Sequence, residues 1–338
     1  MKTIFEQTEI NNLKLKNRLF RSATWDGLVK PDGTLTEEIY TIHRELAEGG
    51  VGAIVTGLTD VSPYDWALVG NMRLCSDTLI PDYKHLTDIV KSHDCRILAQ
   101  LNMNNYIRAE KRLTKVDIND LTHEDIKDII NLFMQSAIRA EKAGFDGVQI
   151  HLAYGWILNR FINPTHNNRN DEYGGTPSNR ARIIIEILKA IKQATPNLHI
   201  GTKFSFYDNA DSSVAIDDCV AICGLLSDNG IDSIEVLGSH SPKENDPTQE
   251  ACFLDLALAV KQKINTPVIL TGNNHDIKNM EHLLNETGIG YFALSRPLIR
   301  EPDLPKKWHS GDTAKAKCIS CSKCYSTYGK RCIFNSKK

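Results

Sequence analysis

Apolar and β-branched residues recur along the chain in short runs, and segments with helical periodicity separate these runs. Residues 126–144 show the helical pattern, and this segment ends at Gly144, a residue type that commonly ends helices. Strands that read as apolar runs and alternate with helices indicate parallel pairing with both faces buried. Eight such runs occur, at residues 18–25, 51–59, 96–102, 147–152, 199–206, 233–240, 267–273 and 291–297.

This alternation predicts the fold. Eight strand–helix units in about 300 residues fit a closed (β/α)₈ TIM barrel better than a doubly wound sheet. Asn11 and Asn12 lie between two short alternating runs, which predicts an N-terminal β-hairpin plug ahead of the first barrel strand. We expect the barrel to cover residues 1–310 and a short Cys-rich C-terminal tail to cover residues 311–338. The sequence has neither GxGxxG after a strand nor GxxxxGK[ST], so it lacks the usual dinucleotide and P-loop motifs.

Composition narrows the class of protein. The 338 residues are 41% hydrophobic and 24% charged, which is enough to bury a large core. The formal charge of −2 and the absence of a long basic block argue against nucleic acid and acidic membranes as partners. We expect a cytoplasmic protein with a small-molecule substrate, because no run approaches the ~20 apolar residues of a membrane span. A homo-oligomer is compatible with the sequence.

In a barrel of this kind, chemistry lies at the C-terminal ends of the strands. Gln100 offers a donor and an acceptor, as an imide edge requires, and Lys203 supplies a positive charge that can stabilise an anion. The runs TGNN and LSRP, after the seventh and eighth strands, are suited to a phosphate. The strand-end candidates are Ser22, Ala23, Thr24, Gln100, Asn102, His151, Lys203, His240, Gly272, Asn273, Ser295 and Arg296.

Residues 151–183, HLAYGWILNRFINPTHNNRNDEYGGTPSNRARI, resemble the stretch after the fourth strand in the old yellow enzyme family. The resemblance extends in order from INNLKLKNRLFRSAT through ILAQLN and TPVILTGN to LSRPLIREPDLPKKW. It implies an enzyme with noncovalent FMN that takes hydride from NADH or NADPH and passes it from flavin N5 to an electron-poor small molecule. The implied flavin contacts are Ser22, Ala23 and Thr24 near O4 and N5, Gln100 at the pyrimidine edge, Lys203 at N1 and O2, and Gly272, Asn273, Ser295 and Arg296 at the phosphate.

The resemblance also implies catalytic residues. His151 and Tyr154 would hold the oxygen of the substrate, although relatives usually have His or Asn in place of Tyr154. Trp156 stands where the family normally has the tyrosine that protonates the substrate, and an indole N–H cannot serve as an acid near pH 7. Tyr154 and His240 are the candidate proton donors, with water as an alternative, and His240 is equally compatible with a packed structural role.

The tail contains the strongest local motif, C-x₂-C-x₂-C-x₇-C, formed by Cys318, Cys321, Cys324 and Cys332. Four thiolates at this spacing can hold a [4Fe–4S] cluster or a structural zinc. The trimethylamine dehydrogenase and 2,4-dienoyl-CoA reductase branch of the family carries a cluster on a comparable motif, followed by nucleotide-binding domains that do not follow here. Iron–sulfur, zinc and free thiols therefore stay open. The other cysteines, which read as small core residues, are Cys75, Cys95, Cys219, Cys223 and Cys252.

Three functional hypotheses follow. The leading one is an FMN-dependent NAD(P)H oxidoreductase that reduces an enone or another activated alkene. A second is an oxidative dehydrogenase of a small amine-like substrate, which the tail would suit. A third is a flavin-binding barrel with degraded catalysis, which Trp156 motivates.

Overall fold

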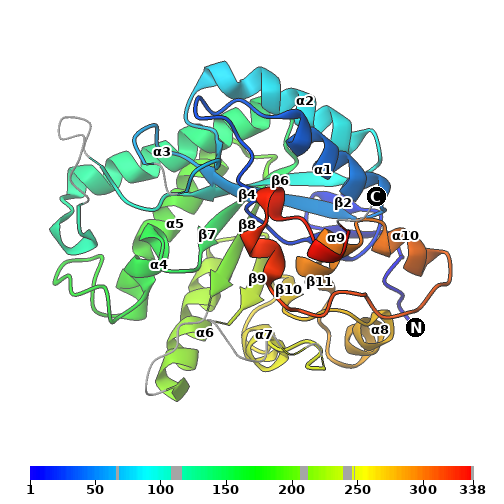
Figure 1. Ribbon diagram of the computed structural model, residues 1–338. Coiled ribbons are helices and arrows are strands. Elements are labelled where there is room, and N and C mark those ends of the chain that lie inside the picture. The colour runs from blue at the N-terminus through cyan, green and yellow to red at the C-terminus, as the bar shows by residue number, and fades with distance from the viewer. Residues whose placement is uncertain (66–67, 108–115, 206–211, 239–245, 247, 336–338) are drawn as a thin grey trace.

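The computed structural model describes residues 1–65, 68–107, 116–205, 212–238, 246 and 248–335. Within them a closed barrel of parallel strands is surrounded by helices (Figure 1). The eight barrel strands are β3 (Leu19–Arg21), β4 (Ala53–Asp60), β6 (Arg96–Asn102), β7 (Gly147–Leu152), β8 (His199–Ser205), β9 (Ser233–Leu237), β10 (Val268–Thr271) and β11 (Tyr291–Leu294).

The strand order confirms the predicted fold class. Neighbouring strands follow the order β3-β11-β10-β9-β8-β7-β6-β4, and pairing of β3 with β4 closes the ring. Seven of the eight apolar runs contain one of these strands in full, and the run at residues 51–59 contains all of β4 except Asp60. A short extra strand, β5 (Met72–Arg73), pairs with the end of β4. The barrel therefore presents all its strand C-termini at one end, where the candidate residues were expected.

The other end of the barrel is closed by the predicted hairpin. Strands β1 (Thr8–Ile10) and β2 (Leu13–Leu15) pair antiparallel, and the turn between them contains Asn11 at a φ of 51°. Asparagine tolerates this left-handed conformation better than most residues. Ile10, Leu13 and Leu15 pack inside the barrel in one cluster with strand residues such as Phe20. The hairpin thus acts as an apolar plug at the N-terminal end of the barrel.

Helices cover the outside of the barrel (Figure 1). The long helix α3 begins with a capping box between Thr122 and Asp125, and Gly144, at a φ of 82°, follows its end as predicted. The helices are α1 (Glu37–Glu48), α2 (Ile80–Lys91), α3 (His123–Lys142), α4 (Ile157–Ile162), α5 (Pro177–Ala194), α6 (Ser212–Asp228), α7 (Leu254–Lys261), α8 (Ile277–Glu286), α9 (Arg296–Arg300) and α10 (Leu304–His309).

The residues after α10 run back over the barrel. Their backbone pairs with the loop after β10, where the Ala316 N–H donates to the His275 carbonyl at 2.9 Å. The described part of this tail contains short 3₁₀ helices at Lys323–Ser326, Tyr328–Lys330 and Ile333–Asn335. Among the described helices, none has the length and apolar character needed to cross a membrane.

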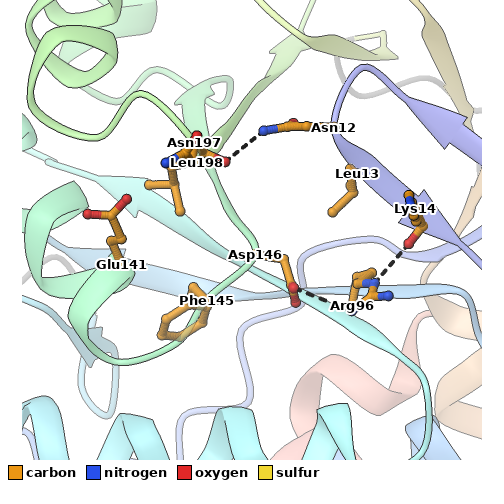
Figure 2. A pocket seen from close by; sticks show the side chains of 9 residues that line it. All are labelled: Asn12, Leu13, Lys14, Arg96, Glu141, Phe145, Asp146, Asn197 and Leu198. Carbon is orange, nitrogen blue, oxygen red and sulfur yellow. Dashed lines mark hydrogen bonds and ion pairs between the residues drawn. The ribbon is translucent and has the colours of Figure 1, made fainter.

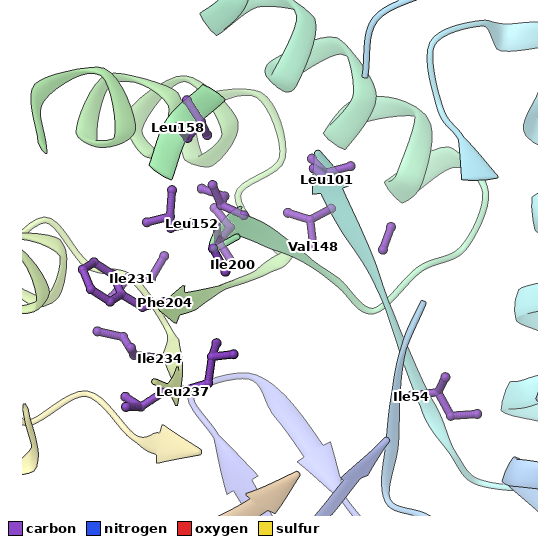
Figure 3. Packing of buried hydrophobic residues seen from close by; sticks show 14 of the residues in the cluster. Ile54, Leu101, Val148, Leu152, Leu158, Ile200, Phe204, Ile231, Ile234 and Leu237 are labelled. Atoms are coloured by element: carbon purple, nitrogen blue, oxygen red, sulfur yellow. The ribbon is translucent and has the colours of Figure 1, made fainter. Parts of the chain in front are cut away.

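Alternation along the strands separates the outer core from the barrel interior. Leu101, Leu152, Phe204 and Ile234 belong to the outer core, between the strands and the helices (Figure 3). Side chains of successive strand residues point to opposite faces, so their polar neighbours point into the barrel. This arrangement directs Asn102, His151, Lys203 and Glu235 inward at the C-terminal end.

Candidate active site

A cavity opens at the C-terminal end of the barrel, between the ends of β3, β8, β10 and β11. Tyr325 from the tail also lines it, so the tail covers part of the barrel mouth. Thr24 joins the same group of residues through a 3.0 Å hydrogen bond between its Oγ1 and Ser295 Oγ. The predicted residues that line the cavity together are Ser22, Ala23, Tyr154, Lys203, Gly272, Asn273, Ser295 and Arg296.

The floor of this region holds a buried ion pair that the sequence analysis missed. Lys203 Nζ lies 3.2 Å from Glu235 Oε1, and both side chains are almost fully buried. Lys203 Nζ also donates to Ser22 Oγ at 2.7 Å, and Ser22 Oγ donates to Glu235 at 2.6 Å. Thr271 Oγ1 donates to the same carboxylate oxygen at 2.7 Å. The predicted cation is therefore present at the barrel mouth, and a carboxylate offsets its charge.

The network continues to Gln100 through a second glutamine. Gln149 Nε2 donates to Glu235 Oε2 at 2.8 Å, and Gln100 Nε2 donates to Gln149 Oε1, also at 2.8 Å. The other Gln100 atoms are buried with it. A side-chain N–H of Gln100 is thus already engaged inside the protein, which limits what this residue offers to a ligand.

Electrostatics keep Glu235 ionised. Burial by itself would raise the pKa of this carboxyl, but the Lys203 ammonium and the hydrogen bonds from Ser22, Thr271 and Gln149 lower it below its ordinary value. The result is a compact set of opposite charges with satisfied hydrogen bonds, which is the arrangement that allows charges to stay buried.

His151 lies on β7 level with Lys203, to which it is the register partner. Burial, and then the Lys203 charge, lower the pKa of His151 to about 3, so the ring is neutral at pH 7. Neither ring nitrogen has a hydrogen-bond partner among the described residues. The imidazole can therefore donate one N–H bond and accept another when a ligand arrives.

Tyr154 stands beside His151 in an unusual backbone conformation. Its φ is 59°, the two ring centroids are 5.9 Å apart, and the side chain is 51% exposed. A left-handed tyrosine costs of the order of 1 kcal/mol or more and commonly marks a functional position. Trp156 precedes α4 as its N-cap residue. The expected pairing of His151 with the residue three positions later is therefore present in space.

On the far side of the cavity, the backbone after β10 packs closely against Cys252 and Phe253 at Gly272. Gly272 has a φ of 105°, and a Cβ there would lie 2.6 Å from the Phe253 ring and 2.7 Å from Cys252 Sγ. Arg296 Nη2 donates to Asn273 Oδ1 at 3.2 Å, and Nη1 donates to Ser322 Oγ at 3.1 Å. The guanidinium is thus held between the loop after β10 and the tail.

The four tail cysteines line one small cavity together with Arg296 and Arg300. Arg296 is part of this cavity and of the cavity at the barrel mouth, so it separates the two. Burial raises the pKa of the Cys318 and Cys324 thiols, and the Arg296 charge partly opposes this effect. The four predicted thiols therefore lie around one cavity, and the positively charged Arg296 and Arg300 line the same cavity.

The spacing of the thiols bears on the kind of metal. Among the described residues, one group of three or more candidate ligands has donor atoms all within 4.8 Å of one another, and it consists of His123, Asp171 and Glu172. No three of the tail sulfurs are that close together. Four sulfurs around one zinc ion, each at about 2.3 Å, would be about 3.8 Å apart. No trio of the tail sulfurs therefore has the close spacing of ligands around a single zinc ion.

A second hollow lies at the opposite end of the barrel, where the hairpin meets the strand N-termini (Figure 2). Its polar groups are already paired: Arg96 donates to the Lys14 carbonyl at 2.8 Å and lies 3.7 Å from Asp146, and Asn12 donates to the Asn197 carbonyl at 2.7 Å. This end of a (β/α)₈ barrel serves stability, so we assign it no chemistry.

Two further predictions have different outcomes. His240 lies outside the described residues, so its place relative to the cavity is not defined. Of the cysteines expected in the core, Cys95, Cys219 and Cys223 are buried, while Cys75 and Cys252 are partly exposed. The sequence did contain a signal for the missed Glu235, because a glutamate between Ile234 and Val236 in an apolar strand must be paired when buried.

Comparisons with known proteins match this architecture. The model of the NADH:flavin oxidoreductase / NADH oxidase family matches residues 3–314. A 4,4'-dithiodibutanoate disulfide reductase from Rhodococcus erythropolis is 26% identical, over 98% of this chain and 94% of the relative. A metal reductase from Desulforamulus reducens is 28% identical over 95% of this chain, which spans 51% of that longer relative. The solved structure of an old yellow enzyme homologue from Zymomonas mobilis superposes with a TM-score of 0.79 at 20% identity, covering 95% of this chain and 96% of the other.

Proposed function

The chain belongs to the NADH:flavin oxidoreductase / NADH oxidase family and is a flavin-dependent oxidoreductase, and we propose that it reduces an electron-poor alkene, such as an enone, with NADH or NADPH. The observation that carries this proposal is the neutral His151 beside Tyr154 at the mouth of the barrel. Two hydrogen-bond donors there suit a carbonyl oxygen that gains negative charge during reduction.

The residues at the barrel mouth fit FMN. Gly272 and Arg296 both line the cavity at the barrel mouth, and the Arg296 guanidinium supplies the charge opposite to that of a phosphate. Lys203 and Ser22 offer a cation and a hydroxyl to the ring system. The unpartnered buried nitrogens of His151 and the unpartnered Asn102 amide also indicate that this end of the barrel is completed by a ligand.

FMN, when bound, accepts hydride from a reduced nicotinamide and delivers it to the substrate. The protein residues supply orientation and charge. His151 donates a hydrogen bond to the substrate oxygen and polarises the alkene, and Lys203 provides positive charge close to the ring. Tyr154 is our candidate donor of the proton that the product carbon receives. Its phenol can act as an acid, whereas the indole N–H of Trp156 cannot give up its proton near pH 7.

Purification and rapid mixing test this proposal. The protein should purify yellow, or take up added FMN, and the bound flavin should bleach with NADH or NADPH without oxygen and recover its colour on addition of 2-cyclohexenone. A protein that neither holds nor binds FMN would contradict the family chemistry. A flavin that binds but is not reduced at a useful rate would favour a binding role instead.

We also propose that the tail, residues 311–338, holds a [4Fe–4S] cluster. Each thiolate of such a cluster binds a different iron, so the sulfurs stand further apart than around one zinc ion, and no three of the tail sulfurs lie within 4.8 Å of one another here. Arg296 and Arg300 beside the thiols would offset the negative charge of the cluster. A bound cluster would supply a one-electron centre on the other side of Arg296 from the flavin cavity.

Metal analysis tests the tail. Anaerobically purified protein should contain about four iron and four sulfide per chain, the complement of one such cluster, with broad absorption near 400 nm on top of any flavin bands. Cys324→Ser should lose the iron, whereas Cys95→Ser, at a buried cysteine far from the tail in sequence, should keep it. One zinc per chain without sulfide would replace this proposal with a structural zinc site.

A further inference from the structure

Three neighbouring barrel strands carry a polar side chain at, or one residue before, their C-terminal ends, at one level. Asp60 is the last residue of β4 and pairs in register with Asn102, the last residue of β6. The β6–β7 register pairs Leu101 with Ile150, which places Asn102 level with His151. Adjacent strands are about 4.8 Å apart, so these three side chains are neighbours around the barrel. We call them the strand-end subsite.

The side chains of the subsite point into the barrel. Val61, Leu101, Met103, Ile150 and Leu152 all belong to the outer core between strands and helices. The residues between or beside them in sequence therefore face the interior. Asp60, Asn102 and His151 are each buried to 2% exposure or less.

Two of the three subsite residues, Asn102 and His151, make no side-chain hydrogen bond of normal geometry within the described part of the protein. Neither amide atom of Asn102 and neither ring nitrogen of His151 has a hydrogen-bond partner among the described residues. Buried polar atoms without partners are rare in folded proteins and indicate a missing ligand or water. The Asn102 amide and the His151 ring therefore place donors and acceptors side by side on two adjacent strands. A ligand that has both a donor and an acceptor can bond to both residues.

Asp60 adds an acidic group to this pair. Both of its oxygens accept from Asn71 Nδ2, at 3.2 and 3.1 Å, and the Oδ1 of Asn71 is itself unpartnered. Burial, opposed by the Asn71 hydrogen bond, raises the pKa of Asp60 to about 7; the charges of Asp65 and Arg73 act in opposite directions. The Asn102 side chain lies close enough to the Asp60 carboxyl to lower its pKa, as a weak hydrogen bond does, although the pair falls short of normal hydrogen-bond geometry. A buried carboxyl of this kind is often found at a functional site.

We propose that the strand-end subsite recognises a lactam, with His151 donating to the carbonyl oxygen and the Asn102 carbonyl, next to the Asp60 carboxyl, accepting from the ring N–H. The proposal rests on the proposed function and narrows it to unsaturated cyclic amides. A lactam holds its N–H and C=O on the same side of the ring, so both groups can reach two adjacent strands. A lactone of the same shape presents a ring oxygen instead, which the acceptors of the subsite would repel.

The imide edge of a flavin has the same donor–acceptor chemistry and is the alternative source of a partner. Gln100 is the residue expected at this edge of the flavin, but its Nε2 already donates to Gln149. Asn102 is a second residue able to bond the same edge, so a separate measurement has to distinguish the flavin from the lactam as its partner. If Asn102 served the flavin, its replacement would weaken FMN binding and would leave any preference among substrates unchanged. The two sources therefore predict opposite results for one variant.

Calorimetry with saturated, unreactive ligands tests the proposal. For the FMN-loaded enzyme, 2-pyrrolidinone should bind at least about 10-fold more tightly than γ-butyrolactone, which differs only by O in place of N–H. Asn102→Leu should remove this preference and keep FMN affinity. Asn197→Leu, at an exposed residue of the opposite barrel end, should keep both. The same preference should appear between 3-pyrrolin-2-one and 2(5H)-furanone as substrates.

Equal binding of lactam and lactone to the wild-type enzyme would overturn the proposal, as expected if the subsite holds only water. Loss of FMN affinity in Asn102→Leu with an intact lactam preference would assign Asn102 to the flavin and would overturn it as well. If the protein binds no FMN, the proposed function fails separately. The same titrations on the flavin-free protein then still decide whether the subsite prefers the lactam.

Discussion

Lys203 and Glu235 form an ion pair inside the barrel, with Nζ 3.2 Å from Oε1. The two residues are register partners on β8 and β9, so the pairing of the strands holds the charges together. Ser22 bonds to both of them, which links the pair to the first barrel strand. The Glu235 carboxylate therefore partly offsets the positive charge that Lys203 would present to a flavin.

This pair predicts opposite effects of two substitutions on the flavin. Lys203→Met should lower the reduction potential of bound FMN, because positive charge stabilises the reduced, anionic ring. Glu235→Gln should raise it, because the lysine charge is then no longer offset. Potentials measured by equilibration with a reference dye check both. If neither variant changes the potential while FMN stays bound, the pair does not act on the flavin.

The same pair should be strongly coupled in stability. Either single variant leaves a buried charge without its partner, and such losses typically cost about 3–5 kcal/mol. The double variant Lys203→Met/Glu235→Gln removes both charges and should recover much of that loss. Urea unfolding of all four proteins gives the coupling free energy. Additive losses would show that the two groups do not interact.

Arg296 and Arg300 offer a matched pair for the cofactor sites. Arg296 lines the cavity at the barrel mouth, whereas Arg300 lines the cavity of the tail cysteines and not the one at the barrel mouth. Arg296→Ala should weaken FMN binding about 10- to 100-fold, since a hydrogen bond to a charged group contributes about 1.5–3 kcal/mol. Arg300→Ala should leave FMN affinity unchanged. Quenching of flavin fluorescence on titration measures both, and equal losses would place the phosphate elsewhere.

The sequence could predict the barrel because each of the eight barrel strands coincides with its own apolar run to within one residue. It could predict residues at the strand ends because barrel geometry brings them together. It could not predict the bond between Ser22 and Glu235, which are 213 positions apart. That contact depends on the register of the strands and on closure of the ring, which hydrophobic periodicity does not specify. The unpartnered Asn102 is likewise visible only once its neighbours are placed.

Buried histidines predict how stability depends on pH. His43 is buried on α1, with Nδ1 2.8 Å from the Ile39 carbonyl oxygen, and burial lowers its pKa to about 4. The unfolded chain binds a proton at this residue below pH ~6.5, and the folded chain does so only below about 4. The free energy of unfolding should therefore rise with pH through this window and be lost as pH falls through it.

A substitution isolates the contribution of His43. His43→Gln should flatten the pH dependence of the free energy of unfolding between pH 4 and 6.5, by up to about 3 kcal/mol over the window. The variant His282→Gln, at an exposed histidine of α8, serves as the control and should leave the slope unchanged. Urea unfolding at a series of pH values measures the slope. An unchanged slope in His43→Gln would mean that this ring takes up its proton without unfolding.

Tyr154 is the candidate proton donor. Tyr154 keeps a left-handed φ of 59° next to His151, and its hydroxyl is the group that Tyr154→Phe removes while the ring stays. If this hydroxyl protonates the product carbon, oxidation of the reduced flavin by 2-cyclohexenone should slow by about 100-fold. Reduction by NADH should be unaffected, and the slow oxidation should persist at saturating 2-cyclohexenone, where weaker binding from the loss of one donor to the substrate oxygen no longer limits the rate. Tyr328→Phe, on the exposed part of the tail, should behave as the wild type.

A second substitution decides between Tyr154 and water as the donor. Trp156 is two residues along, at the start of α4, where a tyrosine could present its own hydroxyl. The double variant Tyr154→Phe/Trp156→Tyr should therefore recover much of the lost rate if a phenol is what the reaction needs. A full rate in Tyr154→Phe alone would instead assign the proton to water or to His240, because His151 is neutral at pH 7, with its pKa lowered to about 3, and a neutral imidazole N–H is too weak an acid.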